Sequence, residues 1–174
     1  MEKLFNDLEF ETIELYKSYR LNHFSLLFMK NYYIEESKEN FLTNFILDDK
    51  SIGQIKFIGE NMLEATNDNG RYQFLLASAS IVSFYQIWED KYRKKIAKNL
   101  NIEKIDSEIY YELNKLRQSI LHNDHRPTND FLKVANNLSF VNENGVLKLT
   151  VDEVHKIYLE LKKEINFLKE KYSK

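Results

Sequence analysis

Apolar residues recur at helical spacing over most of the chain. One stripe lies within residues 2–30 and a stronger one within residues 71–99, so each segment is predicted to form a long amphipathic helix. The first stripe consists of Leu4, Leu8, Leu15, Tyr19 and Leu26. The second consists of Phe74, Ala77, Ile81, Phe84, Trp88, Tyr92 and Ile96, and its aromatic members are expected in the core or at a dimer interface. His23, on the first helix, is expected on the surface.

Two shorter helices are predicted between these long ones, at residues 38–48 and 52–66. Ser51 and Gln54 form a capping box that would open the second of them, and the segment NDNG at 67–70 would close it.

The next stripe is Ile109, Leu113, Leu116 and Ile120, which predicts a helix capped by Asp106. Because Pro127 disfavours helical geometry at the residue before it, this helix should end near residues 122–125. A short helix at about 129–136 is expected to follow.

The period then changes in the segment LSFVNENGVLKLT. Phe140, Val146 and Leu147 flank an Asn-Gly pair, which predicts a β-hairpin. Thr150 and Glu153 form a capping box before a final amphipathic helix. The pattern as a whole predicts one all-α domain over residues 1–174, an up-and-down helical bundle with a small β-hairpin before the C-terminal helix.

Composition agrees with a helical bundle and narrows the chemistry. The 4 Gly and 1 Pro leave few turns, and 12 Phe and 11 Tyr suit a tightly packed core. With 0 Cys there are no disulfides, thiolate nucleophiles or Cys-ligated zinc. The net charge of −2 gives no general basic surface, so any contact with nucleic acid must be local. The N-terminus lacks the apolar run of a signal peptide, and no apolar span is long enough for a membrane; a cytoplasmic protein is expected.

The segment LRQSILHND, residues 116–124, holds the candidate chemistry. Arg117 and His122 both lie off the predicted core stripe. They stand about 140° apart around the helix and about 7.5 Å along it, so they converge on one ligand only if the helix end bends or a second subunit contributes. An imidazole that exchanges a proton with a ribose 2′-hydroxyl, beside a guanidinium that holds the phosphate, suits cleavage of RNA without a metal. The simpler interpretation is a helix end whose histidines complement the dipole.

Two weaker candidates accompany this pair. His122, Asp124 and His125 are compatible with part of a metal site, but no further His or Cys cluster completes it, so neither a metal nor a cofactor is expected. A cationic run with Arg93, Lys94 and Lys95 at its centre could follow an RNA backbone, or could be a solvated helix end.

The segment RQSILHN resembles the motif of the HEPN (higher eukaryotes and prokaryotes nucleotide-binding) family, in which an Arg is followed after four to six residues by a His. Arg117, Gln118, His122 and Asn123 match its Arg, its polar successor, its His and a common Asn. Gln118 stands where the most active members often have Asn or Asp. The resemblance covers roughly residues 71–172, including the segment FYQIWEDKYRKKIA and the expected hairpin and capped helix.

This resemblance implies a metal-independent endoribonuclease that leaves a 2′,3′-cyclic phosphate, of the kind found in toxin–antitoxin and abortive-infection systems. It implies a homodimer whose two motifs meet in one cleft, RNA as substrate and an antitoxin protein as a further partner. Arg117 and His122 would be catalytic, supported by Gln118, Asn123, His125 and Arg126. Two alternatives stay open: a non-catalytic module that binds a nucleotide, RNA or a protein, and a helical interaction protein in which the motif is accidental.

Overall fold

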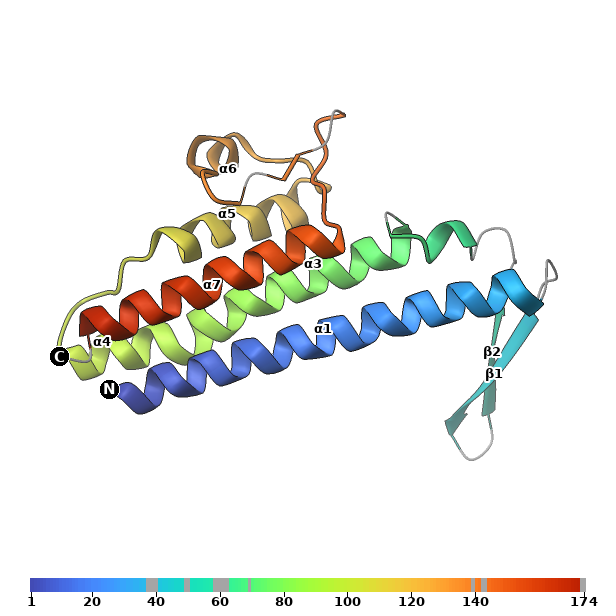
Figure 1. Cartoon of the computed structure of the whole chain (residues 1–174), viewed down its shortest axis with the longest axis horizontal. Helices are drawn as coiled ribbons and strands as arrows, with labels where there is room; N and C mark the ends of the chain where they lie inside the picture. The colour runs from blue at the N-terminus through green and yellow to red at the C-terminus, as the bar shows by residue number, and fades with distance from the viewer. Residues whose placement is uncertain are drawn as a thin grey trace.

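The computed structural model describes residues 1–36, 41–48, 51–57, 63–68, 70–138, 140–141 and 144–172, and for 32–36 and 41–57 it describes the backbone alone. The described chain is predominantly helical, as predicted. Its long helices run alternately up and down side by side, and the N- and C-termini lie at the same end (Figure 1). The elements are α1 (Glu2–Glu36), β1 (Phe41–Asp48), β2 (Ser51–Phe57), α3 (Arg71–Gln86), η1 (Ile87–Arg93), α4 (Lys94–Leu100), α5 (Glu108–His122), α6 (Asn129–Val134) and α7 (Val151–Tyr172).

The core is built from the stripes that the spacing predicts. Helix α1 packs against α3, η1 and α7, and α3 packs against α5 and α7. In the second stripe the fully or nearly fully buried members are Ala77, Ile81, Phe84, Trp88, Tyr92 and Ile96. Trp88 stacks on Tyr110 of α5 with 4.2 Å between ring centroids, so the aromatic stripe lies in the core.

The π-helical segment η1 joins α3 to α4 without a break. Its i→i+5 hydrogen bonds put more residues into each turn than an α-helix holds. Phe84, Trp88, Tyr92 and Ile96 are spaced by four, which in an α-helix would rotate each about 40° from the last. The wider turn keeps all four buried on one side.

The predicted helices at 38–48 and 52–66 are wrong over residues 41–48 and 51–57. Residues 41–48 and 51–57 are two antiparallel strands that pair Phe41 with Phe57 and Ile46 with Ile52. The sequence is rich in β-branched residues here, and Gly53 would cost a helix about 1 kcal/mol. Ser51 and Gln54 therefore belong to β2 instead of capping a helix. Within 58–66, residues 58–62 lie outside the described part of the chain, and 63–65 form one helical turn.

Helix α5 begins one residue later than predicted. The cap is Ser107, whose hydroxyl accepts a hydrogen bond from the Tyr110 N–H at 3.2 Å, while Asp106 pairs with Lys104 at 3.1 Å. Helix α6 ends at Val134, slightly earlier than expected.

Of the predicted hairpin before α7, residues 139, 142 and 143 lie outside the described residues, and the others form a single bridge. Val141 and Leu147 form an isolated antiparallel pair, and the Lys148 N–H donates to the Phe140 carbonyl at 2.8 Å. Gly145 has a φ of +69°, as the turn of the predicted Asn-Gly pair requires. One half of the predicted capping box before α7 is present: the Thr150 N–H donates to the Glu153 carboxylate, and the Thr150 hydroxyl donates to it as well.

Candidate functional site

Helix α5 places the candidate residues at one end of the bundle. Its predicted stripe of Ile109, Leu113, Leu116 and Ile120 is buried, which fixes the rotation of the helix about its axis. That rotation leaves Gln118 half-buried and His122 exposed on the outer side. The sequence pattern therefore predicted correctly that neither catalytic candidate belongs to the core stripe.

Arg117 is half-buried and is turned toward α3. Its guanidinium lies 5.0 Å from the centroid of the Tyr85 ring, and its Nη2 donates to Asn114 Oδ1 at 3.3 Å. Its Nε is buried and has no hydrogen-bond partner among the described residues. A buried guanidinium N–H without an acceptor costs free energy, and the Nε of Arg93 is in the same state.

The surroundings of Arg117 form a small polar hollow between α3, η1 and α5. Tyr85 donates to Glu89 at 3.2 Å, and Arg93 donates to the same carboxylate at 2.8 Å. Burial raises the pKa of Tyr85, and Glu89 raises it further, while the positive charges of Arg117 and Arg93 oppose the rise. Beside them lies a pocket of about 110 Å³, which is also lined by Asn114.

His122 is the last residue of α5 and is exposed. Within the described chain it has no hydrogen bond, ion pair or ring contact, and none joins it to Arg117. The structure therefore leaves the two side chains apart within one protomer. Helix geometry gives the reason, because residues five apart do not share a face.

The turn after α5 is built from the residues that the motif resemblance marks as supporting. Asn123 accepts the Arg126 N–H at 2.9 Å, and its side-chain amide donates back to the Arg126 carbonyl at 2.9 Å. Asp124 and His125 have φ angles of +49° and +59°, in the left-handed region that costs a residue with a side chain free energy. Asn123 thus holds a strained reversal of the chain before Pro127.

His125 docks this turn onto the rest of the bundle. Its ring meets Phe74 of α3 edge-on with 4.5 Å between centroids, and its carbonyl accepts the Leu147 N–H at 3.0 Å. It is half-buried, whereas Arg126 is exposed and its side chain makes no hydrogen bond, ion pair or ring contact within the described residues. His125 is therefore a packing residue, and His122 and Arg126 are the free groups of the turn.

Ser119 and Thr128 also position the turn, and neither was singled out from the sequence. The Ser119 hydroxyl accepts the Thr128 N–H at 3.0 Å, and the Thr128 hydroxyl caps α6 by accepting the Phe131 N–H at 3.2 Å. A Thr directly before a predicted short helix is a cap signal that could have identified Thr128. Ser119 lies mid-helix and gave no such signal.

The cationic run lies toward the opposite end of the bundle from His122 (Figure 1). Arg93 is neutralised by Glu89, and Lys91 pairs with Glu11 of α1 at 2.7 Å. Lys94 and Lys95 are exposed and have no ion pair among the described residues. The run is thus partly used in holding η1 to its neighbours.

His23 was expected on the surface, and that prediction is wrong. It is 7% exposed, and its Nδ1 lies 2.8 Å from Gln73 Oε1; Gln73 in turn donates to the Tyr19 hydroxyl at 2.6 Å. This network joins α1 to α3 inside the core. Burial raises the pKa of Tyr19 to about 12.

In the part of the chain that the structure describes, no group of three or more His, Cys, Asp or Glu is arranged to hold a metal ion, and no helix is long and apolar enough to cross a membrane. Comparisons with protein-family models, with curated proteins and with solved structures find no match to this chain.

Proposed function

We propose that this chain is a metal-independent endoribonuclease of HEPN type, acting as a homodimer on RNA. The observation that carries the proposal is the state of α5: an exposed, uncommitted imidazole at His122 and an unpartnered guanidinium N–H at Arg117, five residues earlier. In RNA cleavage without a metal, the nucleophile is the substrate's own 2′-hydroxyl. The protein then needs only a group that transfers protons, such as an imidazole, and a cation that holds the phosphate, such as a guanidinium.

In this mechanism an imidazole removes the proton of the 2′-hydroxyl as its oxygen attacks phosphorus. The bond from phosphorus to the 5′-oxygen breaks, and that oxygen takes up a proton, giving a 2′,3′-cyclic phosphate and a 5′-hydroxyl. Arg117 holds the phosphate and the charge that develops on its oxygens. Gln118 and Asn123 border the site, and Arg126 adds charge near the exposed end of α5.

The second subunit resolves the separation of Arg117 and His122. A two-fold axis beside α5 would bring the Arg117 of one protomer toward the His122 of the other, and each cleft would be built from both chains. The exposed face of α5, with Tyr111, Gln118 and Leu121, is available for that contact. Toxin or abortive-infection roles, a cytoplasmic location and an antitoxin partner belong to this proposal as well.

The direct test is cleavage of total RNA in EDTA. Wild-type protein should release fragments ending in a 2′,3′-cyclic phosphate, and His122→Ala should abolish release while its circular dichroism spectrum is unchanged. His155→Ala is the matched control, because His155 is also an exposed helical histidine but lies on α7. Undiminished cleavage by His122→Ala would refute the proposal.

Mixing two inactive variants tests whether the cleft is shared. In a composite site, a heterodimer of Arg117→Ala and His122→Ala chains holds one cleft with both wild-type groups. Activity should therefore return on mixing, to about one quarter of wild type if subunits exchange at random. No recovery, with exchange demonstrated, would show that each site lies within one chain.

A second candidate is a module that binds RNA without cleaving it. The contacts of Arg117 with Tyr85 and Asn114 favour this alternative, because they hold the guanidinium away from His122 in one protomer. Binding of labelled RNA that is lost in Arg117→Ala, with no product from the wild type, would establish it.

A further inference from the structure

Helix α1 carries a second apolar stripe, opposite the one that faces the core. Its members are Phe10, Leu21, Phe24 and Phe28, which are 63%, 68%, 64% and 67% exposed. At 100° per residue they fall within about 60° of one another. The buried residues of the same helix, on the other side of its axis, are Phe5, Leu8, Thr12, Tyr19 and His23. A helix with apolar residues on two opposite faces is typical of an element packed between two partners.

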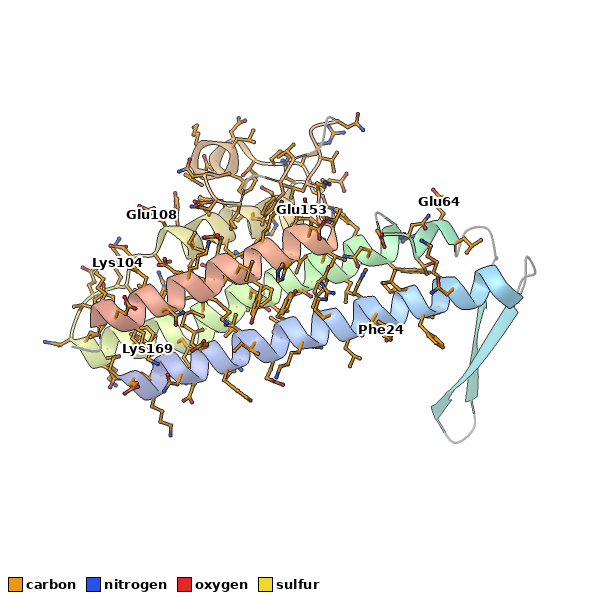
Figure 2. The ribbon with its side chains drawn as sticks, in the orientation of Figure 1. Phe24, Glu64, Lys104, Glu108, Glu153 and Lys169 are labelled. Carbon is orange, nitrogen blue, oxygen red and sulfur yellow. The ribbon has the colours of Figure 1, made fainter. Side chains whose placement is uncertain are left out.

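The outer stripe faces away from the bundle. Figure 1 shows α1 at the edge of the bundle, and Figure 2 shows Phe24 projecting from the side of α1 that is turned away from α3 and α7. The contacts of α1 with α3, η1 and α7 are made by its other face.

The exposed apolar area is large for a free surface. With roughly 200 Å² for a whole side chain of this size, the four residues expose on the order of 500 Å². Phe10 is separated from the other three by polar positions, and Leu21, Phe24 and Phe28 together expose about 400 Å². Contiguous apolar patches of about this size and above on soluble proteins commonly bind something. A standard interface buries about 800 Å² per partner, so these four side chains would supply most of the apolar centre of one.

We propose that a second copy of this chain covers the outer stripe, with the two α1 helices antiparallel. Glu14 and Lys17 occupy the stripe positions between Phe10 and Leu21. Both are well exposed, and within one helix they pair with each other at 2.7 Å. A two-fold axis between residues 15 and 16 sets each Glu14 opposite the partner's Lys17 and each Phe10 opposite the partner's Leu21. Parallel helices in register would set Lys17 against Lys17 and Glu14 against Glu14, which is repulsive.

The charge of α1 also argues for a second copy of the chain, and against a membrane, as the surface that covers the outer stripe. Helices that lie on a membrane surface are rich in Lys and Arg on their polar face. Residues 2–30 of α1 contain five acidic residues, among them Glu9 and Glu11, and only four basic ones. The balance favours a partner of matching mixed charge, which a second copy supplies.

This association is independent of the proposed ribonuclease activity. The outer face of α1 and the exposed end of α5 lie on opposite sides of the bundle (Figure 1), so one assembly can use both contacts. Loss of the α1 contact then leaves a monomer if α5 forms no interface and an α5-linked dimer if it does, so the mass falls in either case.

Light scattering after size-exclusion chromatography at micromolar concentration tests the proposal. The double variant Phe10→Asp, Leu21→Asp replaces the two side chains that the register sets against each other, so its mass should fall to half that of the wild type or less, with an unchanged circular dichroism spectrum. The control is Phe167→Asp on α7, where a Phe is similarly exposed at 55%; it should keep the wild-type mass. A wild-type monomer, or an unchanged mass for the double variant, would overturn the proposal.

A charge exchange tests the antiparallel register. Lys17→Glu and Glu14→Lys alone should each weaken association by about 10-fold or more, equivalent to 1.4 kcal/mol, because each creates two like-charge pairs across the axis. An equimolar mixture of the two variants should associate as the wild type does, since the heterodimer restores opposite charges. If the mixture does not recover, the proposed register is wrong. If the protein is a monomer that binds phosphatidylglycerol vesicles through the outer stripe, the stripe binds a membrane and not a second copy of the chain.

Discussion

Glu112 is a buried polar residue of α5 whose loss is expected to cost substantial stability. It is 3% exposed, and its carboxylate accepts the N–H groups of Asn137 and Leu138, each at 3.0 Å, and the Asn137 side-chain amide at 2.8 Å. These bonds fasten the segment after α6 to α5. The same segment leads to the bridge at Val141 and Leu147, whose backbone holds His125.

Glu112→Ala removes the acceptor and leaves the donors behind. A donor that loses its acceptor in a buried place costs about 1–3 kcal/mol, so two backbone N–H groups give an expected loss of about 3 kcal/mol. For a chain of this size that lowers the melting temperature by about 6–12 °C. Glu112→Gln should lose only about 1–1.5 kcal/mol, because its carbonyl oxygen still serves the backbone while its amide meets that of Asn137.

Urea unfolding followed by circular dichroism at neutral pH measures both losses. Glu103→Ala is the control. Glu103 is exposed and forms no ion pair in the described chain, so its replacement should change stability by less than about 0.5 kcal/mol. If Glu112→Ala unfolds within about 0.5 kcal/mol of the wild type, the carboxylate does not anchor this segment and the reasoning fails.

Three further predictions concern charge and chemistry. Arg117→Lys keeps the charge but loses the planar fork, so turnover on RNA should fall by about 10-fold or more while affinity in a filter-binding assay changes little. The hydrogen bond from Lys91 holds the pKa of Glu11 below its ordinary value, so Glu11→Gln should be less stable than the wild type at neutral pH. The difference in unfolding free energy between the two proteins should vanish as pH falls through that lowered pKa. Burial raises the pKa of Tyr19 to about 12, so the stability that this side chain contributes is complete below pH 10 and is lost as pH rises toward 12. In urea titrations, the unfolding free energies of wild type and Tyr19→Phe should therefore converge or cross between pH 10 and 12. A constant difference would contradict the assignment.

The site itself was only partly predictable. The period of the α5 stripe placed Arg117 and His122 off the core, and Pro127 set the end of the helix. The period could not reveal that Arg117 turns toward Tyr85 or that His125 packs on Phe74, because those partners lie more than 30 residues away in the chain.

By itself, the sequence determined those features whose interacting residues are close together along the chain. The long helices follow from spacings of three and four, and the Thr150–Glu153 box from two residues three apart. Only the tertiary structure decided the rest. The strands at 41–57 replace the predicted helices because the two segments supply each other's backbone hydrogen-bond partners. His23 is buried because Gln73, 50 residues further along the chain, is its hydrogen-bond partner in the core. Local period records which face of an element is apolar, and only packing decides which neighbour meets that face.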